Sequence, residues 1–236
     1  MKKIIICLVT LQLISSCNEL QQVVNQLPQS GTLGNDEIAN GLKQALNFGI
    51  EKQVTKLSGE NGFFKNELVK ILLPDELKKV DKTLRSIGLG KLADEGLKVL
   101  NRAAEDAVGE ATPIFVDAVK NITFNDAKNI LLGNDDAATS FLKQQTENAL
   151  YTKFNPIIDK SFKKVGADQI WSNLITKYNN LPLTTNVNPD LTDYVTTESL
   201  KGVYTMIAIE EKEIRTKTSS RTTALLKRVF ALQDRD

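Results

Sequence analysis

The sequence predicts an all-α fold, a bundle-like domain of short to medium amphipathic helices that follows a flexible N-terminal tether. Three observations support this prediction. From Asp36 onward, apolar residues recur at intervals of three and four, which is the period of an α-helix. Residues that start or stop helices separate these apolar patterns. No segment alternates convincingly between apolar and polar residues, as a half-buried strand would.

The first half of the domain is divided by glycine and proline. The helix with the clearest pattern, 91–109, carries many small residues on its apolar face, so a neighbouring helix can approach it closely. That face consists of Leu92, Gly96, Leu97, Leu100, Ala103, Ala104 and Ala107. The elements expected in this half are a helix from 36 up to the turn 59–62, a short apolar segment over 63–73, and helices over 75–87 and 91–109.

The second half contains stronger start signals. Thr112 before Pro113 is a candidate N-cap, and Thr123 with Asp126 has the spacing of a capping box. Asn155 and Pro156 are predicted to be the N-cap and first residue of a new helix. The elements expected here are helices over about 114–122, 124–133, 134–154, 156–166 and 167–179, a loop over 180–190, and helices over 197–217 and 219–231.

The N-terminus has the form of a bacterial lipoprotein signal. Two lysines and an apolar stretch precede Ile14-Ser15-Ser16-Cys17, which matches the lipobox of that class. The match implies cleavage before Cys17 and lipid, such as palmitate, on Cys17; an ordinary secretory signal with a chance cysteine is the alternative. We therefore expect a signal peptide over 1–16, a lipid-anchored flexible tether over 17–35 and a single helical domain over 36–236.

Lipidation would place the protein in the bacterial cell envelope, facing the periplasm or on the outer membrane. The membrane would be its first partner, through the acyl chains on Cys17, because each buried methylene contributes roughly 0.8 kcal/mol. The 30 basic and 29 acidic residues nearly balance. No global field therefore attracts nucleic acid, and we expect no nucleic-acid partner.

Composition narrows the chemistry available. The chain has no histidine, and its two cysteines are Cys7, in the predicted signal, and Cys17. This excludes His-based triads and zinc sites, as well as a thiolate nucleophile in the mature domain. Catalysis would have to use carboxylates, lysine or hydroxyl groups, or a metal site made only of oxygen ligands. We expect no cofactor and no metal, and we favour a non-catalytic protein.

Glu211 is the most unusual polar residue in the predicted pattern. It projects into an apolar stripe of its helix, between Ile207 and Ile214. A carboxylate in such a place must be paired or must take up a proton. Arg215, one turn further, is the first candidate for a buried ion pair; Arg102, Arg221 and Arg228 are others. We favour a structural ion pair over a tuned acid in a cleft.

Three other polar groups have both a structural and a functional interpretation. Arg102, Glu105 and Asp106 project opposite an apolar face, so we expect a solvated face with surface ion pairs rather than a ligand site. Residues 134–136 (Asn-Asp-Asp) with Thr139 are expected to cap a helix rather than bind a metal. The hydroxyls and arginine of 219–223 are expected to serve as an N-cap rather than bind phosphate.

Several short motifs, taken in their order along the chain, resemble those of a known family. They include Asn101-Arg102-Ala103-Ala104-Glu105, Pro113-Ile114-Phe115, Asp136-Ala137-Ala138-Thr139, Glu210-Glu211, Ile214-Arg215 and Arg221-Thr222-Thr223. With these motifs, the chain resembles domain-of-unknown-function family 4197 over roughly residues 33–232. The resemblance implies a bacterial secreted or lipid-anchored protein and brings no assigned activity. Leu100 stands where methionine is expected in the family, which is a conservative change in a core.

Three functions remain open from the sequence. The first is an anchored, non-catalytic module that binds an envelope protein or glycan or stabilises an assembly. The second is a carboxylate-dependent hydrolase that acts on an envelope glycan with Glu211 and a second acid. The third is a carrier that encloses an apolar ligand. A closed core in which Glu211 is paired to an arginine would favour the binding module. A cleft with two unpaired acids would favour the hydrolase, and a dry cavity of several hundred Å³ would favour the carrier.

Overall fold

The computed structural model describes residues 33–234, except 87, 89, 165 and 181–189. The predicted signal peptide, Cys17 and nearly all of the predicted tether lie outside the described residues, as does most of the loop expected over 180–190. The helices described below belong to one compact unit, Asn35–Asp236.

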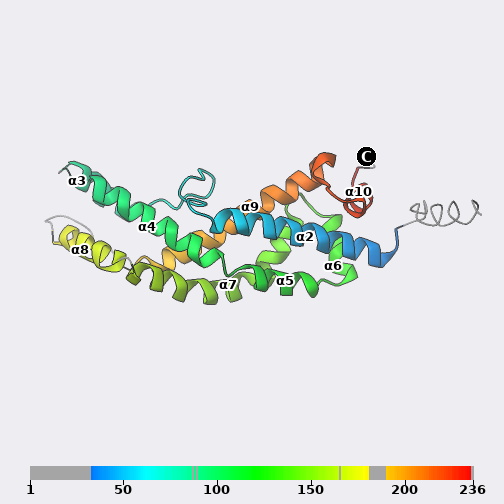
Figure 1. The fold of residues 1–236 in the computed structure, drawn as a ribbon, viewed down its shortest axis with the longest axis horizontal. Helices are drawn as coiled ribbons and strands as arrows, with labels where there is room; N and C mark the ends of the chain where they lie inside the picture. Colours follow the sequence, from blue (N-terminus) through cyan, green and yellow to red (C-terminus); the bar gives the residue numbers. More distant parts are fainter. Residues whose placement is uncertain (1–32, 87, 89, 165, 181–189, 235–236) are drawn as a thin grey trace, which may run out of the picture. The chain divides into compact units, whose positions relative to one another are not determined.

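Every regular element among the described residues is a helix, which confirms the all-α prediction (Figure 1). The first helix, α2, begins at Asn35, where the tether was expected to end. The elements are α2 (Asn35–Ser58), α3 (Asp75–Ser86), α4 (Gly90–Val108), α5 (Thr112–Lys120), α6 (Phe124–Leu131), α7 (Ala137–Lys164), α8 (Ala167–Asn179), α9 (Thr192–Thr216), the 3₁₀-helix η1 (Thr218–Ser220) and α10 (Ala224–Phe230).

Four long helices, α2, α4, α7 and α9, form the centre of the domain, where α4 and α9 each pack on the other three (Figure 1). The shorter α5 packs on α2 and α7, α10 packs on α2, and α8 packs on the pair α4 and α7. Large apolar side chains from these helices are fully buried, as Leu100, Phe115 and Phe154 illustrate. Phe115 meets Tyr204 edge to face, with 5.9 Å between the ring centres, which joins α5 to α9.

Helix α7 continues through Pro156, so the prediction of a helix start at Asn155-Pro156 is wrong. Proline inside a helix lacks one N–H and costs roughly 3 kcal/mol. Against that cost, Phe154, Ile158 and Phe162 lie on one buried face of the same helix. Each such side chain contributes about 1.5–3 kcal/mol when buried. The burial of the continuous apolar face therefore outweighs the loss of one helix hydrogen bond at Pro156.

Two helix starts also differ from the expectation. The N-cap of α5 is Ala111, with no side-chain cap, so Thr112 lies inside the helix. Helix α9 begins at Thr192, five residues before the predicted start, and the Asp190 carboxylate accepts a hydrogen bond from the Thr192 N–H at 2.9 Å. By contrast, the predicted capping box at Thr123 and Asp126 is present at the start of α6.

The chain after α9 is less helical than expected. The helix predicted over 219–231 is divided into η1 and the short α10, with Arg221 between them in a non-helical conformation. Thr223 caps α10 through its hydroxyl, which accepts a hydrogen bond from the Leu226 N–H at 3.2 Å. None of the helices in the described part of the chain has the length and apolar content that a bilayer span requires.

Candidate functional site

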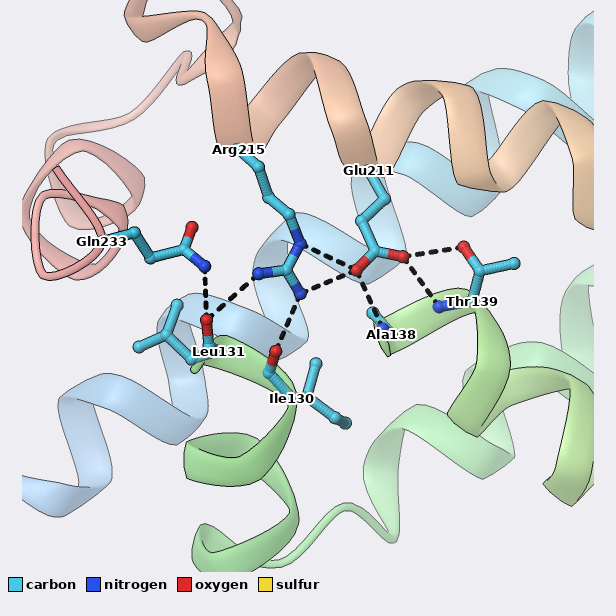
Figure 2. Close-up of polar contacts among 7 residues, drawn as sticks. All are labelled: Ile130, Leu131, Ala138, Thr139, Glu211, Arg215 and Gln233. Carbon is cyan, nitrogen blue, oxygen red and sulfur yellow. Dashed lines mark hydrogen bonds and ion pairs between the residues drawn. The ribbon is translucent and has the colours of Figure 1, made fainter. Parts of the chain in front are cut away.

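The structure brings Glu211 and Arg215 together on α9, where both residues are buried, at 7% and 6% exposure (Figure 2). Arg215 Nε and Nη2 both donate to Glu211 Oε1, at 2.9 and 2.7 Å. The residues are one helical turn apart, so their own helix positions the contact. A charge pair this deep in a core needs further hydrogen bonds to offset its desolvation, and both partners have them.

Glu211 caps the beginning of α7. Its carboxylate accepts hydrogen bonds from the backbone N–H groups of Ala138 and Thr139 and from the Thr139 hydroxyl, each at 2.8 Å (Figure 2). The first N–H groups of a helix have no partner within the helix, and the helix dipole favours a negative charge there. Five donors therefore converge on the two carboxylate oxygens, which fills the roughly four lone-pair positions available.

The sequence analysis placed the capping carboxylate of this helix within residues 134–136, immediately before the start of α7. These residues are exposed, and Asp135 lies 3.6 Å from Lys212 in a surface ion pair. The carboxylate that reaches the Ala138 and Thr139 N–H groups comes instead from α9. Among the described residues, no group of three or more acidic or cysteine side chains could hold a metal ion.

Arg215 performs the opposite task at the end of α6. Its Nη1 donates to the carbonyl of Leu131 at 3.1 Å, and its Nη2 donates to that of Ile130 at 2.8 Å. The Gln233 side chain also donates to the Leu131 carbonyl (Figure 2). A positive charge is stabilising at a helix C-terminus, where the last carbonyls have no partner. The Glu211–Arg215 pair thus joins the end of α6, the beginning of α7 and α9.

Arg221 caps the end of α9 in the same manner. It is 2% exposed and donates to the carbonyls of Ile214 and Arg215, at 3.0 and 2.8 Å. It also donates to the Asp234 carboxylate, and its guanidinium lies over the Phe230 ring at 5.8 Å from the ring centre. The hydroxyl of Thr223 is engaged as the N-cap of α10. Capping therefore accounts for the Arg221 and Thr223 side chains of the segment 219–223.

Glu105 is buried at 2% exposure, so the prediction of a solvated polar face on α4 is wrong at this residue. Its Oε1 accepts hydrogen bonds from the backbone N–H groups of Phe63 and Phe64, at 3.1 and 3.4 Å. Its Oε2 lies 3.2 Å from Arg102, which also pairs with Asp106 at 2.9 Å. The irregular segment between α2 and α3 covers this face, and periodicity within α4 could not indicate that cover.

Asn101 is a second buried polar residue of α4, and its role was not predicted. Its side-chain amide accepts from the Ile71 N–H at 2.8 Å and donates to the Ile71 carbonyl at 2.9 Å. Together with Glu105, one turn further, it holds the backbone of the segment between Ser58 and Asp75. The sequence signal for these contacts is that Asn101 and Glu105 are polar residues at i and i+4, beside a stripe of small residues.

Glu210, next to Glu211, is also buried, and the sequence analysis did not predict a separate contact for it. Its two carboxylate oxygens accept hydrogen bonds from Lys52 at 2.7 Å and Gln53 at 2.8 Å, which joins α9 to α2. The same helix carries Tyr204, whose phenol bonds to the Thr146 hydroxyl at 2.8 Å. Burial raises the pKa of Tyr204 to about 12, so the phenol stays neutral at physiological pH.

Two pockets are relevant to the alternative functions of hydrolase and carrier. An open cleft of about 580 Å³ is lined by Asp159, Asp168 and Trp171, and Asp159 pairs with Lys163 at 2.7 Å. A pocket of about 20 Å³ lies beside Glu211 and is lined mainly by apolar side chains. That volume holds about one water molecule, far less than the several hundred Å³ that a carrier of an apolar ligand would need.

A family model described as "Protein of unknown function (DUF4197)" matches residues 32–231 of the chain. The match covers most of the chain and all of the described helices. No curated protein and no solved structure matches the chain.

Proposed function

The chain belongs to the family described as "Protein of unknown function (DUF4197)", and we propose that it is a lipid-anchored, non-catalytic module of the bacterial cell envelope. Cys17 is the proposed attachment point, because the residues before it match the lipobox. The helical domain would then act at the membrane surface on an envelope protein or a glycan. Its location would be the periplasmic space or the outer membrane.

One observation supports a non-catalytic domain above the others. Glu211, the acid that the sequence marks as the best candidate for catalysis, has both oxygens occupied by hydrogen-bond donors from its own fold. A general base or nucleophile needs a free lone pair directed at a substrate. The pairing of Glu211 with backbone N–H groups and Arg215 therefore favours a structural role.

Lipidation is tested by replacing Cys17 with Ala in cells that process lipoproteins. We expect the wild-type protein to carry acyl chains in an intact mass measurement and to fractionate with membranes. The Cys17→Ala variant should accumulate as an uncleaved or unlipidated form. Cys7→Ala is the matched control, since Cys7 lies in the predicted signal peptide and should leave processing unchanged. A wild-type mature protein with an unmodified Cys17 would contradict the proposal.

The hydrolase alternative has one observation in its favour, the cleft that Asp159 and Asp168 line. Purified domain should be assayed against peptidoglycan and other envelope glycans, with Glu211→Gln and Asp168→Asn beside the wild type. We expect no turnover by any of the three proteins. Turnover that is lost in one variant while its helical circular dichroism is unchanged would establish an enzyme and identify its acid.

A further inference from the structure

Arg221 is a buried cation that pairs with one carboxylate among the described residues. Two of its hydrogen bonds go to the carbonyls of Ile214 and Arg215, which are neutral groups. The charge is balanced by Asp234, whose Oδ1 lies 2.9 Å from Arg221 Nη2 and whose Oδ2 contacts Nη1. This two-point contact is the geometry that arginine uses to bind carboxylates in general.

Asp234 differs from Arg221 in its surroundings. Its side chain is 47% exposed, and it lies in the segment that follows α10. The Arg221 guanidinium holds the pKa of the Asp234 carboxyl below its usual range, mainly through the hydrogen bond, so the carboxylate is ionised at neutral pH. Gln233 beside it donates to the Leu131 carbonyl, which also accepts from Arg215 (Figure 2). The segment therefore touches both the Arg221 site and the Glu211–Arg215 network.

We propose that Arg221 forms a carboxylate-binding site, and that residues 231–234 are a displaceable strap that fills it with the protein's own Asp234. When the strap lifts, Arg221 keeps its carbonyl contacts but loses the only carboxylate that pairs with it among the described residues. A buried guanidinium without a counter-ion is unfavourable, so the backbone around Arg221 should loosen at the end of α9, at η1 and at the end of α10. The outward exposure of Asp234 gives a carboxylate from solution a path to the vacated position.

The test uses the full chain and the variant Asp234→Ala, which empties the position and leaves Arg221 in place. Hydrogen exchange should become faster by about tenfold at η1 and the end of α10, as expected for the loss of a hydrogen bond to a charged group. Sodium acetate should slow this exchange more than sodium chloride at the same ionic strength. In the wild type, where Asp234 occupies the site, the two salts should act alike.

The matched control is Asp159→Ala, which removes an exposed carboxylate from an i,i+4 pair with Lys163. We expect no local change in exchange there, because such pairs contribute little. The proposal fails if Asp234→Ala leaves exchange at η1 and α10 unchanged, or if it accelerates exchange equally throughout the helices. It also fails if acetate and chloride have the same effect on the variant.

Discussion

At the residue scale, several buried polar side chains of this protein bind the backbone of segments distant in the sequence. Glu211 holds the beginning of α7, Arg215 the end of α6, and Asn101 the backbone of Ile71. Each contact gives a partner to a backbone group that would otherwise be buried without one. Glu211 and Arg215 are also among the residues on which the family resemblance depends. We infer that these motifs specify how the helices meet.

Removing one partner of the buried pair should therefore be costly. Glu211→Ala leaves the Arg215 guanidinium and two N–H groups of α7 without their acceptor, and we expect a loss of about 3–5 kcal/mol in the free energy of unfolding. Urea denaturation followed by circular dichroism measures this loss. The control is Glu213→Ala, an exposed partner of Lys217 on the same helix, which should cost less than about 1 kcal/mol. Equal effects of the two substitutions would refute a structural role for the buried pair.

At the element scale, glycines set how closely other segments approach the helices. A Cβ atom at Gly96 of α4 would lie 2.6 Å from the Trp171 ring of α8, and one at Gly202 of α9 would lie 2.7 Å from the Phe63 ring. Real Cβ atoms do not reach such distances, so the side chain of Trp171 or Phe63 occupies the space that a methyl group would need. The small-residue face of α4 was predicted to permit close approach, and Gly96 does so for Trp171.

Gly96→Ala should consequently lower stability although alanine is the better helix former. The gain in helix propensity is about 1 kcal/mol. Forcing a methyl group against a buried ring usually costs about 1–3 kcal/mol, so we expect a net loss or at best no gain. Gly109→Ala is the control, because a Cβ there would make ordinary contacts at 3.6 and 3.8 Å. The melting temperatures of both variants, measured by thermal denaturation, test this prediction. A clear stabilisation by Gly96→Ala would contradict the close packing of Trp171 against Gly96.

At the scale of the whole molecule, the described helices belong to one compact unit, Asn35–Asp236. Helix α2 contacts α4, α5, α6, α9 and α10 within it, so the first helix of the unit is part of its core. Leu42, Ile50 and Leu57 of α2 are almost fully buried. The unit should therefore fold without the residues that precede it, and it should depend on α2.

A fragment over 33–236 should show a helical circular dichroism spectrum and one cooperative thermal transition. Its melting temperature should match that of the chain from Cys17 onward, because the core residues of the unit are all present. A second fragment, 59–236, lacks α2 and should lose the cooperative transition, since α9 and α10 would expose the faces that α2 covers. A fragment over 33–236 that fails to fold would show that the preceding residues contribute to the core.

The sequence alone determined the helical class, most helix positions and the depth of Glu211, because these depend on local signals. Apolar periodicity and the Thr123 capping box act within one or two turns, and such patterns can be recognised in a single segment. The Cys17 lipobox is equally local, and its lipidation stays a prediction.

Only the tertiary structure decided which groups the buried side chains bind. Glu105 meets Phe63 across 42 residues, and Glu211 meets Ala138 across 73. The continuity of α7 through Pro156 likewise depends on a buried face shared with other helices. Periodicity describes one helix at a time, whereas a charge is placed and satisfied by whichever distant backbone the packing brings to it.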